Sequence, residues 1–147
     1  MVDRHGRAVA DEVERLLATT LQPIRMPPVC RFRRIELPLD HVPDRTELEG
    51  RLKGPKRTAY YARVLLARLD RGEQLPRSFA YPVQTWRFGD ELTMVFLAGE
   101  VVVDYALRLK RQLEADRTWV TAYANDAPCY IASARVIREG GMRWTSR

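Results

Sequence analysis

The chain has 147 residues, of which 46% are hydrophobic and 30% are charged, and its formal net charge is +6. This is the composition of a globular domain, and no apolar run approaches the roughly twenty residues that a membrane-spanning helix needs. The N-terminus lacks the apolar core of a signal peptide, so export by the usual route is not expected if Met1 is the true start. The excess positive charge is nearly all arginine, interleaved with acidic residues, which favours a solvated surface over a nucleic-acid site.

The first third of the chain predicts a helix, a connector and a strand. Apolar residues at helical spacing predict an amphipathic helix over Arg7–Thr20 that is laid on a core. The apolar positions of this helix are Val9, Val13, Leu16 and Leu17. The prolines of Gln22–Pro28 predict an extended connector, because proline lacks the amide donor that a helix needs. Alternation over Val29–Leu37, with charge on both faces, predicts a strand near a sheet edge.

Two more helices are predicted after the loop that holds His41. Thr46 and Glu49 have the spacing of a capping box, so a short helix is expected to begin there and to end near Gly54. A second amphipathic helix is expected after Pro55 and ends at Asp70–Gly72. Its buried stripe is predicted to contain Tyr61, Val64, Leu65 and Leu69.

The C-terminal half predicts a hairpin followed by a β-α-β unit. Phe79–Phe88 and Leu92–Leu97 are strand-like runs, and Gly89-Asp90 between them is typical of a tight turn. A helix over Val101–Glu114 and a strand over Thr118–Tyr123 follow. The buried stripe of that helix is expected to contain Val102, Tyr105, Ala106, Leu109 and Leu113. We therefore predict an α/β fold with a mixed sheet and flanking helices, in a single domain over 1–147.

Polar residues follow both strands of the β-α-β unit. Parallel strands end at the same sheet edge, so Glu100 and the segment Asn125–Tyr130 are expected to approach one crevice. Gly99 would let the backbone turn sharply before Glu100. Taken alone, Glu100 is also explained as a cap in the first helical turn, and Tyr130 as a packed ring.

Three segments in order resemble a known family: Tyr81–Asp90, Leu97–Tyr105 and Tyr123–Ile131. They are similar to the C-terminal part of the catalytic domain of neutral/alkaline (non-lysosomal) ceramidases, above all the shorter bacterial relatives. Members of that family are zinc amidohydrolases that cleave the amide of ceramide, and they are often secreted or periplasmic. Their zinc is held by two histidines from the N-terminal half and by a glutamate and a tyrosine from the part resembled here. The resemblance implies that Glu100 and Tyr130 are zinc ligands, and that four other residues surround them: Gly99, Asn125, Asp126 and Cys129.

The chain departs from this family in its histidines. It contains only His5 and His41, neither in the family's ligand context, and the family's serine-containing catalytic segment belongs upstream. We therefore expect the C-terminal portion of a larger catalytic domain, inactive by itself, with no catalytic residue of its own. A complementary chain that carries the histidines, or self-association, would complete it, and a lipid amide would then be the substrate.

Two other interpretations remain open at this point. One is a non-catalytic scaffold or interaction module, and the less favoured one is a basic nucleic-acid-binding domain. Cys30 and Cys129 have no metal-binding spacing, and either a disulfide or two buried free thiols would explain them.

Overall fold

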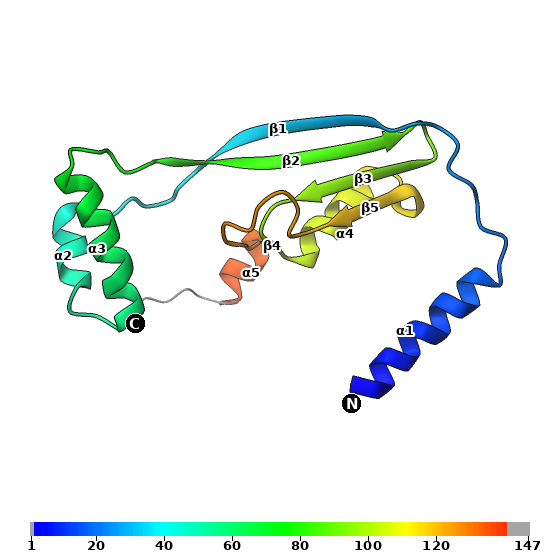
Figure 1. Cartoon of the computed structure of the whole chain (residues 1–147), viewed down its shortest axis with the longest axis horizontal. Coiled ribbons are helices and arrows are strands. Elements are labelled where there is room, and N and C mark those ends of the chain that lie inside the picture. The colour runs from blue at the N-terminus through cyan, green and yellow to red at the C-terminus, as the bar shows by residue number, and fades with distance from the viewer. Residues whose placement is uncertain (1, 141–147) are drawn as a thin grey trace.

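The computed structural model describes residues 2–140. Its main sheet has the strand order β1 (Val29–Pro38), β2 (Ser78–Phe88), β3 (Leu92–Leu97) and β5 (Thr118–Thr121). The first three strands are antiparallel neighbours, and β3 pairs with β5 in parallel. The sheet is therefore mixed and has flanking helices, which confirms the predicted α/β class. The molecule is elongated, with helices at both ends of the sheet (Figure 1).

The predicted hairpin and β-α-β unit are both present. The chain turns between β2 and β3 at Gly89, which has a φ of 53°, and Phe88 pairs with Leu92. Helix α4 (Val103–Gln112) and the short 3-10 helix η1 (Ala115–Arg117) then connect β3 to β5. This connection returns the chain parallel to β3, as the sequence predicts.

A hydrophobic core lies between this part of the sheet and α4. Tyr81, Val95, Leu97 and Ala98 are buried there, and Tyr105 and Leu109 of α4 pack against them. The predicted buried stripe of α4 is only partly right, because Leu113 is exposed and the other four positions are half-buried.

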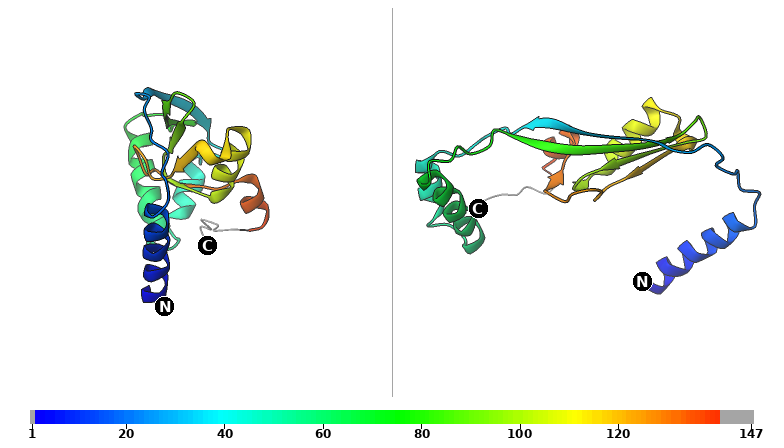
Figure 2. Two further views of the ribbon diagram at one scale, coloured as in Figure 1. Left: turned by 90° about the vertical axis from the view of Figure 1, so that its right-hand side faces the viewer. Right: turned by 45° about the horizontal axis from the view of Figure 1, so that its top comes forward.

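A long two-stranded arm leads from this core to a second one. Strands β1 and β2 pair along their whole length, and the arm ends at α2 (Arg45–Arg51) and α3 (Lys56–Asp70), seen at one end of the molecule in Figure 2. These two helices have their own buried cluster, which contains Leu48, Ala62 and Leu66. The predicted positions Tyr61 and Val64 are exposed, while Ala59, Ala62 and Leu66 are buried. As predicted, β1 lies at the sheet edge.

The predicted capping box at Thr46 and Glu49 is wrong. The N-cap of α2 is Asp44, whose carboxylate accepts a hydrogen bond from the Glu47 amide at 2.8 Å. The Glu47 side chain accepts one from the Asp44 amide at 3.0 Å. The Glu47 carboxylate also lies 2.9 Å from Nε2 of His41. This contact supports an N-cap of α2 that lies two residues earlier than predicted.

Helix α1 (Val2–Leu17) forms, but it is not laid on a core. No side chain of Val2–Leu17 is buried, and the four predicted apolar positions are all exposed: Val9, Val13, Leu16 and Leu17. Figure 1 shows the helix apart from the sheet.

The connector after α1 is held by the Glu91 carboxylate, which accepts hydrogen bonds from the amides of Arg25 at 2.7 Å and Met26 at 3.0 Å. These two bonds keep the pKa of Glu91 below its ordinary value.

The chain exposes more surface than a compact monomer. Its accessible area is 11897 Å², whereas about 7,700 Å² is expected for a compact protein of this mass.

Cys30 and Cys129 are free and exposed, so neither the disulfide nor the buried thiols are found. In the part of the chain that the structure describes, no helix is both long and apolar enough to cross a bilayer.

Candidate functional site at the end of the parallel strands

Gly99 sets the geometry of the sheet edge. Strand β3 ends at Leu97, and Gly99 follows with a φ of 73°, which favours glycine. A Cβ at this position would lie 2.4 Å from the carbonyl oxygen of Cys129, so no larger residue fits without a shift of the backbone. The buried Ala98 carbonyl accepts a 2.8 Å hydrogen bond from the Tyr81 hydroxyl, which holds the turn on the core.

The loop after β5 is held against this turn by backbone hydrogen bonds. The amide of Gly99 donates to the Asp126 carbonyl at 2.9 Å, and the amide of Glu100 donates to the Cys129 carbonyl at 3.0 Å. Next, β4 (Glu100–Val101) and β6 (Tyr130–Ile131) form a separate parallel pair. Glu100 and Tyr130 are register partners in this pair. The two residues singled out by sequence therefore lie on adjacent strands, Glu100 exposed and Tyr130 half-buried.

Glu100 is not in the first turn of a helix. Helix α4 begins at Val103, two residues later than predicted, and the acidic residue in its first turn is Asp104. The explanation of Glu100 as a helix cap is therefore wrong, and its carboxylate is not used at the helix start.

The other residues predicted to surround the ligands shape the loop. The Asn125 side-chain amide donates to Gln84 Oε1 at 3.0 Å, and Asn125 itself has a φ of 65°. The Asp126 carboxylate accepts from the Ala127 amide at 2.8 Å. Cys129 contributes its carbonyl to Glu100, while its thiol is exposed.

Tyr123 is a residue that the sequence did not single out. Desolvation and, after it, the neighbouring Glu100 carboxylate raise the pKa of Tyr123 above its ordinary value. Strand β5 ends at Thr121, so Tyr123 belongs to the loop rather than to the predicted strand. No pattern in the sequence indicates that Tyr123 lies near Glu100, because this placement depends on a backbone conformation that tyrosine rarely adopts.

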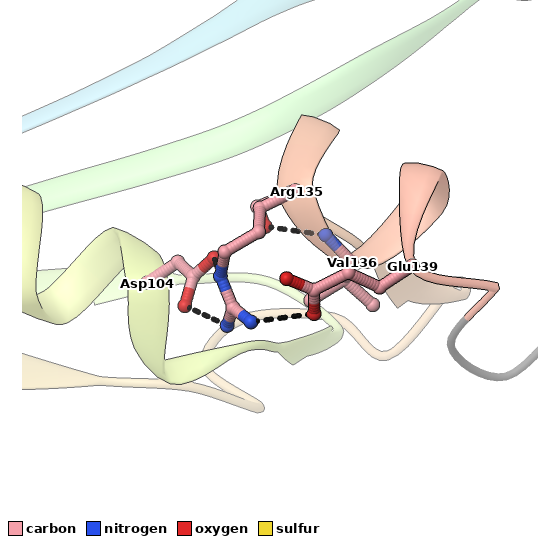
Figure 3. Close-up of polar contacts among 5 residues, drawn as sticks. Asp104, Arg135, Val136 and Glu139 are labelled. Carbon is pink, nitrogen blue, oxygen red and sulfur yellow. Dashed lines mark hydrogen bonds and ion pairs between the residues drawn. The ribbon is translucent and has the colours of Figure 1, made fainter.

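A polar cluster fixes the segment that follows Tyr130. Helix α5 (Ala134–Arg138) places Arg135 against Asp104 of α4, with nitrogen–oxygen distances of 2.7 and 3.0 Å. Figure 3 shows the guanidinium between Asp104 and Glu139, 2.7 Å from the latter. The Ser133 hydroxyl also donates to Asp104. Arg135, followed by Ser133, holds the pKa of Asp104 below its ordinary value.

The histidines lie elsewhere. His5 is on exposed α1, and His41 is bound to Glu47 beside a hollow of about 790 Å³ next to α2 and α3. This hollow is lined by neither Glu100 nor Tyr130. Within residues 2–140, no three side chains among His, Cys, Asp and Glu gather closely enough to hold a metal. A carboxylate and a phenol are suitable oxygen donors for zinc, but they are only part of a ligand set.

Comparisons with known proteins gave no match to this chain. No protein-family model, curated protein or solved structure matches it.

Proposed function

We propose that this chain is the C-terminal part of a zinc amidohydrolase that resembles neutral ceramidases and hydrolyses an N-acyl amide. The observation that carries the proposal is the parallel pairing of β4 with β6, in which Glu100 and Tyr130 are register partners. These are the two residues that the family resemblance assigns to zinc. The close backbone packing at Gly99 supports the proposal, because it fixes both strands to one turn.

Glu100 and Tyr130 would supply two oxygen ligands. Glu100 is exposed, so its carboxylate is accessible to a cation. A phenol binds a cation strongly only as the phenolate, and because free phenols titrate near pH 10 the cation itself has to favour that form. When bound at such a site, zinc supplies a Lewis acid for the amide carbonyl and lowers the pKa of water.

The remaining ligands are proposed to come from a complementary polypeptide that carries histidines. His41 is paired with Glu47 at the α2 end, and His5 lies on α1, so neither belongs to the β4–β6 edge. The accessible area of 11897 Å² supports this view, because it exceeds the compact expectation of about 7,700 Å² and so leaves surface for a partner to cover. The large apolar side chains that such a partner would cover include Val9, Val13, Leu16, Leu17, Phe32 and Ile35.

A zinc titration of the isolated chain tests the metal assignment. Nuclear magnetic resonance detects weak binding, and added imidazole can replace the absent histidine nitrogens. We expect Zn²⁺ to shift the resonances of Glu100 and Tyr130, and we expect Glu100→Gln or Tyr130→Phe to remove the effect. Glu49→Gln on exposed α2 is the matched control. Zinc shifts confined to His41 and Glu47, unchanged by the first two variants, would contradict the proposal.

Hydrolysis of a fluorescent ceramide tests the incomplete site. The isolated chain is expected to show no turnover, because among the described residues no three His, Cys, Asp or Glu side chains gather to hold a metal. Turnover with tight, one-to-one zinc would show that the chain needs no partner.

A second candidate is a non-catalytic interaction module. The exposed apolar face of α1 favours it, since patches of this kind mark contact surfaces. An unchanged spectrum at Glu100 and Tyr130 throughout the zinc titration would select this candidate over the enzyme.

A further inference from the structure

Strand β1 forms one edge of the main sheet, and its outer side is open. It pairs with β2 alone, and all of its residues except Leu37 are exposed. In an antiparallel pair, every second residue directs its amide and its carbonyl away from the partner strand. Along the outer side of β1, which Figure 1 shows at the border of the sheet, these groups are therefore accessible to another strand.

The edge lacks the backbone features that normally block strand addition. The pairing of β1 with β2 runs from Val29 to Pro38 without a break, so no bulge bends the edge away. Proline occurs only at the last position of the strand, and ten residues is long for an edge strand. The backbone of β1 is thus suitable for pairing along its whole length.

The outer part of the arm has no third strand. Strand β3 pairs with β2 only from Val83 onward, so Ser78–Pro82 and residues 34–38 form a two-stranded ribbon. Phe79 and Tyr81 hold this ribbon to the core on one face. A sheet of two strands is marginally stable in water, and a third strand makes it much more stable. An added strand would therefore stabilise the arm.

The charge of β1 selects the kind of strand that fits. Arg31 and Arg33 are separated by one residue, so they lie on the same face of the sheet, beside Thr85 and Val83. Among the described residues, no carboxylate forms an ion pair with either arginine. A strand with acidic side chains at every second position would place carboxylates opposite both of them, and opposite charges on neighbouring strands attract.

We propose that β1 is a docking edge for an extended, acidic segment of a partner polypeptide, which adds to the main sheet as a further strand. A second copy of the chain does not fit, because its own β1 carries Arg31, Arg33 and Arg34 against Glu36 alone. In strand addition, backbone hydrogen bonds supply affinity and alternate side chains supply specificity. The inference goes beyond the proposed function, because it involves neither the metal nor its ligands.

Two synthetic peptides of the length of β1 test the edge on the full chain. The first alternates glutamate with threonine. The second alternates glutamate with proline, so it has the same charge but lacks the amides that a strand needs. We expect the first peptide to shift the amide resonances of β1 and to protect its outward amides from hydrogen exchange. The second peptide should do neither.

Charge reversal tests the selectivity of the edge. In the double variant Arg31→Glu, Arg33→Glu, the affinity for the glutamate–threonine peptide should fall by about 10-fold, and a lysine–threonine peptide should bind instead. The matched control is Lys53→Glu, Arg63→Glu, which makes the same charge change at two exposed positions of the helix pair. It should bind both peptides as the wild type does.

Four results would overturn the inference. Equal binding of the proline peptide would show a charged patch instead of strand addition. Equal binding of the glutamate–threonine and lysine–threonine peptides by the wild type would remove the acidic selectivity. The absence of binding at millimolar peptide would remove the docking edge itself. Protection of β1 that rises with protein concentration, without peptide, would make a second copy the occupant. None of these results bears on zinc binding at Glu100 and Tyr130.

Discussion

The sheet body around Val95 and the helix pair around Leu48 both bury apolar side chains, but they differ in what else is fixed with them. The sheet body also fixes a loop through backbone bonds from Gly99 and Glu100, and the Tyr81 hydroxyl holds the turn that carries these two residues. The helix pair buries Leu48 between two simple helices at the end of an arm. The sheet body therefore combines apolar packing with a fixed loop, whereas the polar contacts of the helix pair fix the start of α2.

The largest expected effect comes from Gly99→Ala. The new Cβ would meet the Cys129 carbonyl at 2.4 Å in a left-handed conformation, so we expect a loss of about 3 kcal/mol or more in unfolding free energy of the sheet body. Gly72→Ala is the control, because Gly72 has a φ of 78° with no atom near its Cβ, and it should cost about 1 kcal/mol. Denaturant unfolding of both variants measures the difference. Equal costs would show that the close approach at Gly99 is not maintained in solution.

Leu48→Ala tests whether the two cores are independent. Leu48 is fully buried, and its truncation should cost the helix pair about 3 kcal/mol. Because the sheet body has its own cluster, the amide resonances of Glu100 and Tyr130 should not change. Spectral changes that reach these two residues would show that the arm transmits the loss.

Acid should loosen the cluster around Asp104 before it affects the rest of the sheet body. The pKa of Asp104 is lowered in the folded state, so its contribution to stability is present above the unfolded pKa of about 3.9 and is lost as the pH falls through the lower folded value. The protection factors of the α5 amides in hydrogen exchange should therefore fall below about pH 4. Asp104→Asn should show lower protection factors for these amides at neutral pH and no further fall on acidification. If the protection of the α5 amides in the wild type does not change through this pH range, α5 does not depend on the Asp104 carboxylate.

The smallest effect is expected from Val13→Ser on α1. This side chain is exposed and α1 buries no residue over Val2–Leu17, so the change in unfolding free energy should stay within about 0.5 kcal/mol. Denaturant unfolding checks this value. A loss of several times that size would show that α1 packs on the isolated chain.

Local patterns predicted the sheet body well. The Gly89-Asp90 turn and the β-α-β order determine the hairpin and the parallel pairing of β3 with β5. That pairing places both strand ends at one edge, which is why the meeting of Glu100 and Tyr130 could be inferred before the loop was known.

Contacts between distant segments account for what the sequence did not predict. The α1 stripe has the periodicity of a packed helix, but periodicity cannot say whether a partner surface exists in the same chain. Asp44 and Thr46 both offer a capping spacing, and the bond between His41 and Glu47 supports the first. Tyr123 was missed because its placement next to Gly99 depends on a left-handed backbone rather than on its residue type.

The arm has a consequence for handling the protein. Strand β1 is a ten-residue edge strand, and an unpaired edge of this length invites strand addition between molecules and fibrous aggregation. Arg31, Arg33 and Arg34 lie along it, so two such edges in antiparallel contact would bring like charges together. The arginines of β1 thus oppose aggregation of the isolated chain. High salt screens their repulsion, so it should shorten the time for which the chain stays in solution before it aggregates.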